Sequence, residues 1–544
     1  SNSMPPKRRF FARSHGKLCL WKIPSFQSAE PPHPNACPAV CGPPEAPITL
    51  EEIGENMPNL TKDDIRSVLE LIKELYLADK IPWICGYSGG KDSTAVVQLV
   101  WTALAQLPES QRHKPVHVIS TDTLVESPVV ALWATRSLER MRRAAEAGGL
   151  PILPHRLVPE VTNTFWVNLI GRGYPYPRRN FRWCTDRLKI DPSNRFVKKI
   201  LDAESEAILV LGTRKAESAT RKAVMEEYEK KRYRAHLSPN GSFPNSYVFS
   251  PIEDWSNDNV WQYLVQYPNP WGHSNKDLLA MYSGASADGE CPLVLDTSTP
   301  SCGNSRFGCW VCTMVSEDKS MAAMIQNDEE KAWMLPMLEF RNEIAATRDV
   351  DRKRRDFRRM DGRLTWHNGH LVHGPYTKET REFFLRRLLE VEKLVHEIGP
   401  EEIRDIPLIT MDELRLIRQL WLDEKHEFED TLPGIYESVT GRPYDDGTIS
   451  KNKYFGAAEA GLLQAACQTV CPDETLMYEL QRALLDIEAK AEAISNKRNV
   501  IQKFEREIQK AFYRSPEEAE QLAQARTETI AGMLEPFDDV DWTE

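Results

Sequence analysis

The feature that most constrains this chain is the hexapeptide Ser88-Gly89-Gly90-Lys91-Asp92-Ser93. It follows a short apolar run, 81–87, that predicts a buried strand, and it leads into 93–107, where apolar residues recur at helical spacing. A strand, a glycine turn and a helix together expose backbone N–H groups at a helix N-terminus, where an anion is favoured. The glycines allow a phosphate to approach the backbone, the lysine adds positive charge and the serines add hydroxyl donors. The motif therefore predicts a phosphate-binding loop; the alternative is a turn that caps an ordinary helix.

Apolar runs and amphipathic stretches predict that strands and helices alternate around this loop. The predicted strands are 81–87, 116–120, 152–158 and 207–211, and the predicted helices are 61–77, 93–107, 128–147 and 192–202. This order predicts an α/β fold with a doubly wound parallel sheet that is covered by helices on both faces. Ligands of such sheets bind beyond the carboxyl ends of the strands, so the residues after each strand are the first candidates for a site.

Polar residues follow two of these strands. Asp122 and Thr123 follow the second strand, where a carboxylate could hold magnesium or bond a nucleotide, although a helix N-cap cluster is the alternative. Gly212 and Arg214 follow the fourth strand, where a guanidinium group could neutralise phosphate, although a solvated charged loop is the alternative. We predict these catalytic residues: Lys91, Asp92, Asp122 and Arg214. We predict these nucleotide-binding residues: Ser88, Gly89, Gly90, Lys91, Asp92, Ser93, Thr123 and Gly212.

The composition is that of an ordinary soluble globular protein. Of 544 residues, 41% are hydrophobic and 27% are charged, and no run of 18 apolar residues predicts a membrane span. The net charge of −11 argues against a uniformly basic coat, so local patches would have to make any contact with nucleic acid. Residues 1–3 ahead of Met4 resemble the remnant of a tag, and no signal peptide is expected. These features predict a cytoplasmic protein.

Two segments combine basic residues in a way that suits nucleic acid. Segment 172–189 interleaves arginine and lysine with tyrosine, phenylalanine and tryptophan, which fits a phosphate backbone with stacked bases. Segment 348–363 is rich in arginine and could lie along a DNA backbone, with a solvated helix face or a docking surface as equal alternatives. Further on, 474–512 has the pattern of one long amphipathic helix and is interpreted as a packing arm or a partner surface.

Four cysteines fall within a short segment. Cys291, Cys302, Cys309 and Cys312 are accompanied by glycines and polar residues, and the last two form a C-x2-C pair that can grip one metal or cluster. Soft thiolates select zinc or iron–sulfur centres, and a structural zinc knuckle is the main alternative. Cys85, just before the phosphate-binding loop, is interpreted as a strand residue.

The motifs together resemble a known group of enzymes. The SGGKDS at 88–93 matches the PP-loop ATP pyrophosphatases, which cut ATP between the α and β phosphates. The blocks at 182–187, 212–221 and 251–255 resemble the phosphoadenosine-phosphosulfate (PAPS) reductase branch of that group. A sulfonucleotide reductase would carry a late Glu-Cys-Gly nucleophile, but no cysteine follows Cys471. With the Arg-Trp-Cys-Thr element at 182–185 and the later cysteines, the chain resembles the DndC family of DNA phosphorothioation proteins.

This resemblance implies an ATP-dependent sulfurtransferase that uses ATP, Mg²⁺ and a [4Fe-4S] cluster. It implies the cluster ligands Cys184, Cys302, Cys309 and Cys312, and leaves open whether Cys291 is one of them. The implied partners are DNA, a cysteine desulfurase as sulfur donor and other Dnd proteins, as in restriction-modification systems. A tRNA-thiolating enzyme, a PAPS reductase-like enzyme and a non-catalytic nucleotide-binding module remain as alternatives.

Four regions are expected along the chain. We predict a mobile N-terminal tail at 1–46, a PP-loop ATP pyrophosphatase domain at 47–285, a cysteine-rich iron–sulfur segment at 286–325 and a helical C-terminal region at 326–544.

Overall fold

The computed structural model describes residues 60–178, 181–285, 308–367, 369–444, 455–471, 476–492, 499–513 and 515–534. Residues Pro58–Glu544 form one compact unit. The predicted tail at 1–46 lies outside the described residues, and so do Cys291 and Cys302.

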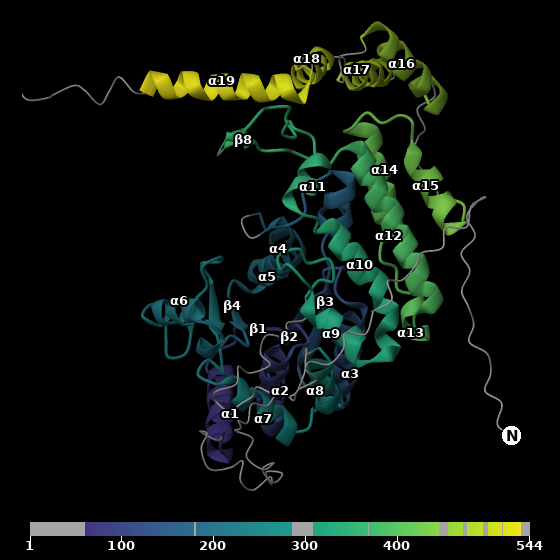
Figure 1. The fold of residues 1–544 in the computed structure, drawn as a ribbon. Helices are drawn as coiled ribbons and strands as arrows, with labels where there is room; N and C mark the ends of the chain where they lie inside the picture. The colour runs from purple at the N-terminus through teal and green to yellow at the C-terminus, as the bar shows by residue number, and fades with distance from the viewer. Residues whose placement is uncertain are drawn as a thin grey trace, which may run out of the picture. The chain divides into compact units, whose positions relative to one another are not determined.

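A six-stranded sheet is the centre of the first half of this unit (Figure 1). Its strand order is β3 (Ile152–Leu157), β2 (Val116–Thr121), β1 (Trp83–Gly86), β4 (Ala207–Val210), β6 (Ser246–Phe249) and β5 (Ser238–Pro239). All neighbours pair in parallel except β5, which is antiparallel to β6. The chain runs outward from β1 to β3 and then returns to place β4 on the other side of β1. The topological switch point, where such sheets bind ligands, therefore lies between β1 and β4.

Helices cover both faces of this sheet, because its strands alternate apolar side chains between the two faces. Trp83 and Cys85 of β1 belong to a core shared with helices on one face, namely α1 (Lys62–Leu77), α2 (Lys91–Gln106), α3 (Pro128–Ala147), α7 (Asn257–Gln266) and α8 (Asn275–Gly284). Ile84, between them, faces the opposite side and packs in a smaller core with Val197 of α5 (Asp191–Glu204). The predicted doubly wound α/β fold is confirmed, and Cys85 is a buried strand residue whose pKa is raised by burial to about 12.

A second core joins the segment between β3 and α5 to the C-terminal helices. Trp166 and Ile170 pack there with residues of α10 (Leu335–Ile344), α12 (Lys378–Ile398) and α14 (Met411–Asp423). The indole N–H of Trp166 donates to the carbonyl of Leu408 at 2.7 Å, and that of Trp421 donates to the carbonyl of Ile170 at 3.0 Å. The C-terminal region is helical as predicted, and its core crosses the predicted boundaries at 285 and 325, which themselves stay predictions.

The remaining elements are short or lie toward the C-terminus. They are α4 (Trp183–Thr185), α6 (Ala219–Glu229), α9 (Lys319–Asn327), α11 (Arg348–Lys353), α13 (Glu401–Arg404), α15 (Thr431–Thr440), α16 (Ala457–Val470), α17 (Met477–Glu492), α18 (Val500–Lys510), α19 (Pro516–Leu534) and the hairpin of β7 (Trp366–His367) and β8 (His370–Leu371). None of the described helices is both long enough and apolar enough to cross a bilayer.

The prediction of one long helix at 474–512 is wrong. Its described residues form α17 and α18, which pack against each other (Figure 1). Amphipathic periodicity reports which residues share a face, but two helices that fold back on each other can keep the same pattern.

Part of each predicted basic segment is buried inside the protein. In the first, Tyr176 and Trp183 are buried core residues, and Arg178 forms an ion pair with Asp351. In the second, the helix ends at Lys353, and Arg358 is 7% exposed and pairs with acidic side chains. These side chains do not belong to a continuous basic surface, whereas Arg352, Arg359 and Arg363 of the second segment are exposed.

Candidate active site

The loop between β1 and α2 is held by its own serines. The Ser88 N–H donates to Ser93 Oγ at 3.2 Å, and that hydroxyl donates to the carbonyl of Gly90 at 3.0 Å. Gly89 has a φ of +75°, which favours glycine, and its carbonyl accepts the indole N–H of Trp133 at 3.2 Å. The sequence therefore forms a rigid turn at the N-terminus of a long helix, where backbone N–H groups attract anions.

The loop after β4 packs closely against the N-terminus of α2. A Cβ at Gly212 would lie 2.9 Å from the carbonyl carbon and oxygen of Asp92, so only glycine fits. Arg214 is 4% exposed; its Nε donates to Asp92 Oδ1 at 2.7 Å and its Nη1 to the carbonyl of Trp255 at 3.2 Å. The other carboxylate oxygen of Asp92 lies 3.2 Å from Nζ of Lys91. The structure thus brings Lys91, Asp92, Gly212 and Arg214 together at the switch point, with Arg214 acting on Asp92 rather than presenting a free guanidinium group.

Replacing Gly212 by alanine should test this close approach. The added methyl group would force the β4 loop away from α2, and overpacking of this kind costs about 1–3 kcal/mol. We expect a lower midpoint of thermal unfolding and weaker nucleotide binding, measured by calorimetry. Gly434 of α15 is the matched control, since nothing lies within 4 Å of a Cβ there. If both alanine variants matched the unsubstituted protein, the tight contact would be contradicted.

Tyr282 of α8 is a site residue that the sequence did not reveal. Its hydroxyl accepts the N–H of Lys91 at 3.4 Å, and the Lys91 ammonium lies 5.6 Å from its ring centroid. The side chain is 8% exposed and packs edge-on against Trp261. No local signal could have found it, because it joins the loop from 191 residues further along the chain.

Asp122 after β2 is engaged by its neighbours. One carboxylate oxygen accepts the N–H of Leu124 at 2.8 Å, and the other accepts Nε of Arg156 at 3.1 Å. Among the described residues there is no group of three or more His, Cys, Asp or Glu side chains arranged to hold a metal ion. The structure therefore gives no support to the expected magnesium site at Asp122.

Thr123 lies against a cysteine. Its hydroxyl is 3.3 Å from Sγ of Cys309, and the N–H of Trp310 donates to the carbonyl of Val125 at 2.9 Å. The segment that leaves β2 therefore runs beside the C-x2-C pair. Glu126 faces Cys309 across an isolated bridge, and burial raises the pKa of its carboxyl to about 7.

The ammonium group of Lys189 interacts electrostatically with three of the four predicted cluster ligands. The thiolate charge of Cys309 is the strongest of the influences that raise the pKa of Lys189. Burial opposes it, and the charges of Glu126, Cys312 and Cys184 add to it. Burial raises the pKa of Cys309 to about 11, and the Lys189 ammonium lowers it in part. Cys184 and Cys312 also interact electrostatically.

Thiol side chains of this kind suit zinc or iron–sulfur centres. Among the described residues, Cys184, Cys309 and Cys312 do not form a group arranged to hold a single metal ion. Between the two cysteines of the C-x2-C pair lie Trp310 and Val311. Each is 1% exposed and packs in the second core, which fixes the position of the segment. The fourth predicted ligand, Cys302, lies outside the described residues.

Arg341 of α10 holds the turn that carries Cys312. It is fully buried, donates Nε to the carbonyl of Cys312 at 2.9 Å and donates Nη1 to that of Ser316 at 2.8 Å. Sequence reasoning missed this residue, because a single arginine among the apolar residues of a helix resembles an ordinary surface position.

The sequence comparisons agree with this architecture. Residues 82–271 match the phosphoadenosine phosphosulfate reductase domain. An uncharacterised protein of Methanocaldococcus jannaschii is 28% identical over 210 residues, which are 38% of this chain and 36% of that relative. The chain thus spans about a third of that relative's length. Residues 82–271 form a PAPS reductase-like domain on a mostly parallel α/β sheet.

Several solved structures share limited similarity with the chain, each at 12% identity. A PAPS reductase of Candida auris in a phosphate complex aligns with a TM-score of 0.22, over 38% of this chain and 87% of its own. The U34-tRNA thiolase NcsA of Methanococcus maripaludis, with its [4Fe-4S] cluster, gives 0.24 over 52% and 81%. An FMN adenylyltransferase of Candida glabrata, with FAD and pyrophosphate, gives 0.25 over 45% and 68%.

Proposed function

We propose that this chain is an ATP-dependent sulfurtransferase that activates a DNA backbone phosphate for phosphorothioation. The observation that carries the proposal is the shared edge of two neighbouring strands. The phosphate-binding loop follows β1, and the Thr123 contact with Cys309 follows β2, which pairs directly with β1. Nucleotide and thiol chemistry can therefore meet at one edge of the sheet.

The loop residues would promote ATP cleavage by positioning the phosphates and by stabilising negative charge. The backbone N–H groups at the start of α2, together with Lys91, would hold the phosphates and stabilise the charge that grows on the departing pyrophosphate. An acceptor phosphate oxygen attacks the α-phosphorus, a P–O bond forms, and pyrophosphate leaves with the electron pair of the bond that breaks. A sulfur nucleophile then attacks the acceptor phosphorus and AMP leaves. Arg214 would position Asp92, which faces the Lys91 ammonium.

The thiol residues would hold the cluster that the resemblance implies. Cys184, Cys309 and Cys312, with Cys302, would bind a [4Fe-4S] cluster, which would supply sulfur-handling or electron-transfer chemistry. Lys189 would offset thiolate charge, and Arg341 would fix the turn that carries Cys312. The expected partners of such an enzyme are a cysteine desulfurase as sulfur donor and other Dnd proteins.

Anaerobic reconstitution with ATP, a sulfur donor and DNA tests this function. We expect mass spectrometry of the nuclease-digested DNA to find phosphorothioate-linked dinucleotides that are absent without ATP. Sulfur in tRNA bases would instead identify a tRNA-thiolating enzyme, and sulfite released from PAPS would identify a reductase. Nucleotide binding without AMP formation, with DNA present, would leave only a nucleotide-binding module.

A further inference from the structure

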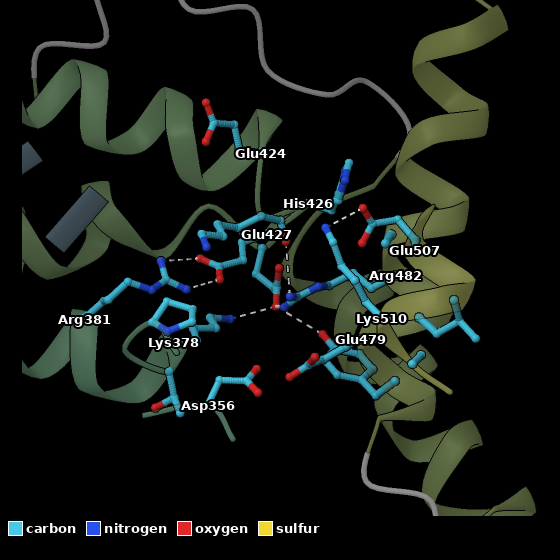
Figure 2. A pocket seen from close by; sticks show the side chains of 18 of the residues that line it. Asp356, Lys378, Arg381, Glu424, His426, Glu427, Glu479, Arg482, Glu507 and Lys510 are labelled. Atoms are coloured by element: carbon cyan, nitrogen blue, oxygen red, sulfur yellow. Dashed lines mark hydrogen bonds and ion pairs between the residues drawn. The ribbon is translucent and has the colours of Figure 1, made fainter. Parts of the chain in front are cut away.

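A large charged cavity lies in the C-terminal helical region (Figure 2). Its volume is about 820 Å³, and it is lined by parts of α12, α16, α17 and α18, the segment after α14, and residues near 356–362. Nine basic and eight acidic residues line it, and none of them belongs to the loop or the thiol cluster described above.

Most of the acidic residues are already paired. Figure 2 shows Arg381 against Glu427. The pairs are Arg381 with Glu427, Lys378 and Arg482 with Glu429, Arg358 with Asp356 and Glu479, and Lys510 with Glu507. Four cations that line the cavity have no ion-pair partner among the described residues: Arg359, Lys425, Lys503 and Arg506.

Buried donors without acceptors also line this cavity. Arg381 and Arg482 are 3% and 7% exposed, and the Nε–H of each has no hydrogen-bond partner in the described structure. Leaving such a donor unsatisfied costs free energy, which an oxyanion or water would recover. Burial, and then the charges of Arg381 and Lys510, lower the pKa of Lys425 to about 8. An anion beside these groups would accept hydrogen bonds from the unsatisfied donors. It would also reduce the repulsion between the neighbouring positive charges.

An open groove continues from the cavity. It shares Met360, Gly362, Arg506 and Lys510 with the cavity and is also lined by Arg363, Phe512 and Tyr513. Phe512 is 77% exposed, although it is a large aromatic ring. Basic side chains beside an exposed ring suit a phosphate backbone and a stacked base, and stacking on a free ring needs an unpaired base.

We propose that this cavity and groove bind a single-stranded segment of nucleic acid, with phosphates on the cavity cations and a base on Phe512. A strand fits better than a free nucleotide, because the cations and the ring extend along connected spaces. The site goes beyond the proposed nucleotide chemistry and does not depend on it. This strand-binding site is separate from the loop at Lys91.

Fluorescence anisotropy with a labelled single-stranded oligodeoxynucleotide tests the proposal. Because Lys503 and Arg506 lie on the surface helix α18, K503E/R506E should fold; we expect it to bind at least about tenfold more weakly. For this variant, the slope of log affinity against log salt concentration should become shallower by about 0.7 for each lost phosphate contact. Phe512→Ala should weaken binding by about fivefold or more, as expected for the loss of a stacked base.

Matched variants separate this site from the ATP site. K62E/R66E on α1 makes the same charge change on another exposed helix and should bind the strand normally. Lys91→Ala should also keep the strand affinity, even where ATP turnover is lost, so the two proposals can fail separately. Unchanged affinity of folded K503E/R506E, or competition by a mononucleotide as strong as by unlabelled strand, would overturn the proposal.

Discussion

Replacing Lys91 by alanine is expected to slow pyrophosphate release from ATP by about 100- to 1,000-fold. Loss of one preorganised group that stabilises transition-state charge typically has an effect of this size. The Lys91 side chain is 11% exposed and lies at the start of α2 against Asp92. The measurement is a coupled pyrophosphate assay on anaerobically prepared protein with an acceptor present.

Lys80→Ala is the control for this variant. Lys80 is an exposed lysine just ahead of β1, so its loss removes the same charge without touching the loop. The control should retain full turnover and the same thermal stability as the unsubstituted protein. Turnover retained by Lys91→Ala would remove the loop from the mechanism.

Replacing Cys309 by serine is expected to remove most of the iron and acid-labile sulfide from anaerobic protein. By analogy with [4Fe-4S] proteins, the unsubstituted chain should carry about four of each. Cys309 belongs to the C-x2-C pair with Cys312, contacts Thr123 and is electrostatically coupled to Lys189. The measurement is colorimetric iron and sulfide analysis with the visible absorption spectrum.

Cys467→Ser is the matched control for this loss. Cys467 is a partly exposed cysteine on α16 and lies outside the set formed by Cys184, Cys309 and Cys312. Its serine variant should keep the full iron content. If the unsubstituted protein instead held one tightly bound zinc ion, these cysteines would form a structural zinc site, and the cluster assignment would fail.

The sheet and the loop could be predicted because their signals are local. The hexapeptide 88–93 directly follows an apolar strand and opens a helix, and short strands before Asp122 and Gly212 place both residues at the same edge. The order of strands along the chain, together with the handedness of parallel crossovers, then leaves few topologies. The confirmed fold follows from these rules.

The supporting residues could not be predicted, because their partners are distant in sequence. Tyr282 reaches Lys91 from α8, and Arg341 reaches the carbonyl of Cys312 from α10. Nothing in the local pattern of either helix distinguishes these side chains from neighbouring polar ones. They become visible only when tertiary packing brings the helices against the loop and the cysteines.

Composition misled the interpretation of segment 172–189. Arginine beside tyrosine and tryptophan fits a nucleic-acid surface, but the same residues also fit the edge of a core. Here the ring of Trp183 stacks on Phe165, and the guanidinium group of Arg178 lies over Tyr176 and pairs with Asp351. Sequence alone cannot separate these uses, since both need amphipathic rings next to cations.

The products formed from ATP test the account most directly. With α-labelled ATP, acceptor DNA, a sulfur donor and anaerobic protein, separation of the labelled products by thin-layer chromatography should show AMP and no ADP, with an equal amount of pyrophosphate. Labelled ADP with free phosphate would mean cleavage between the β and γ phosphates, and would contradict the proposed role of the loop at Ser88–Ser93.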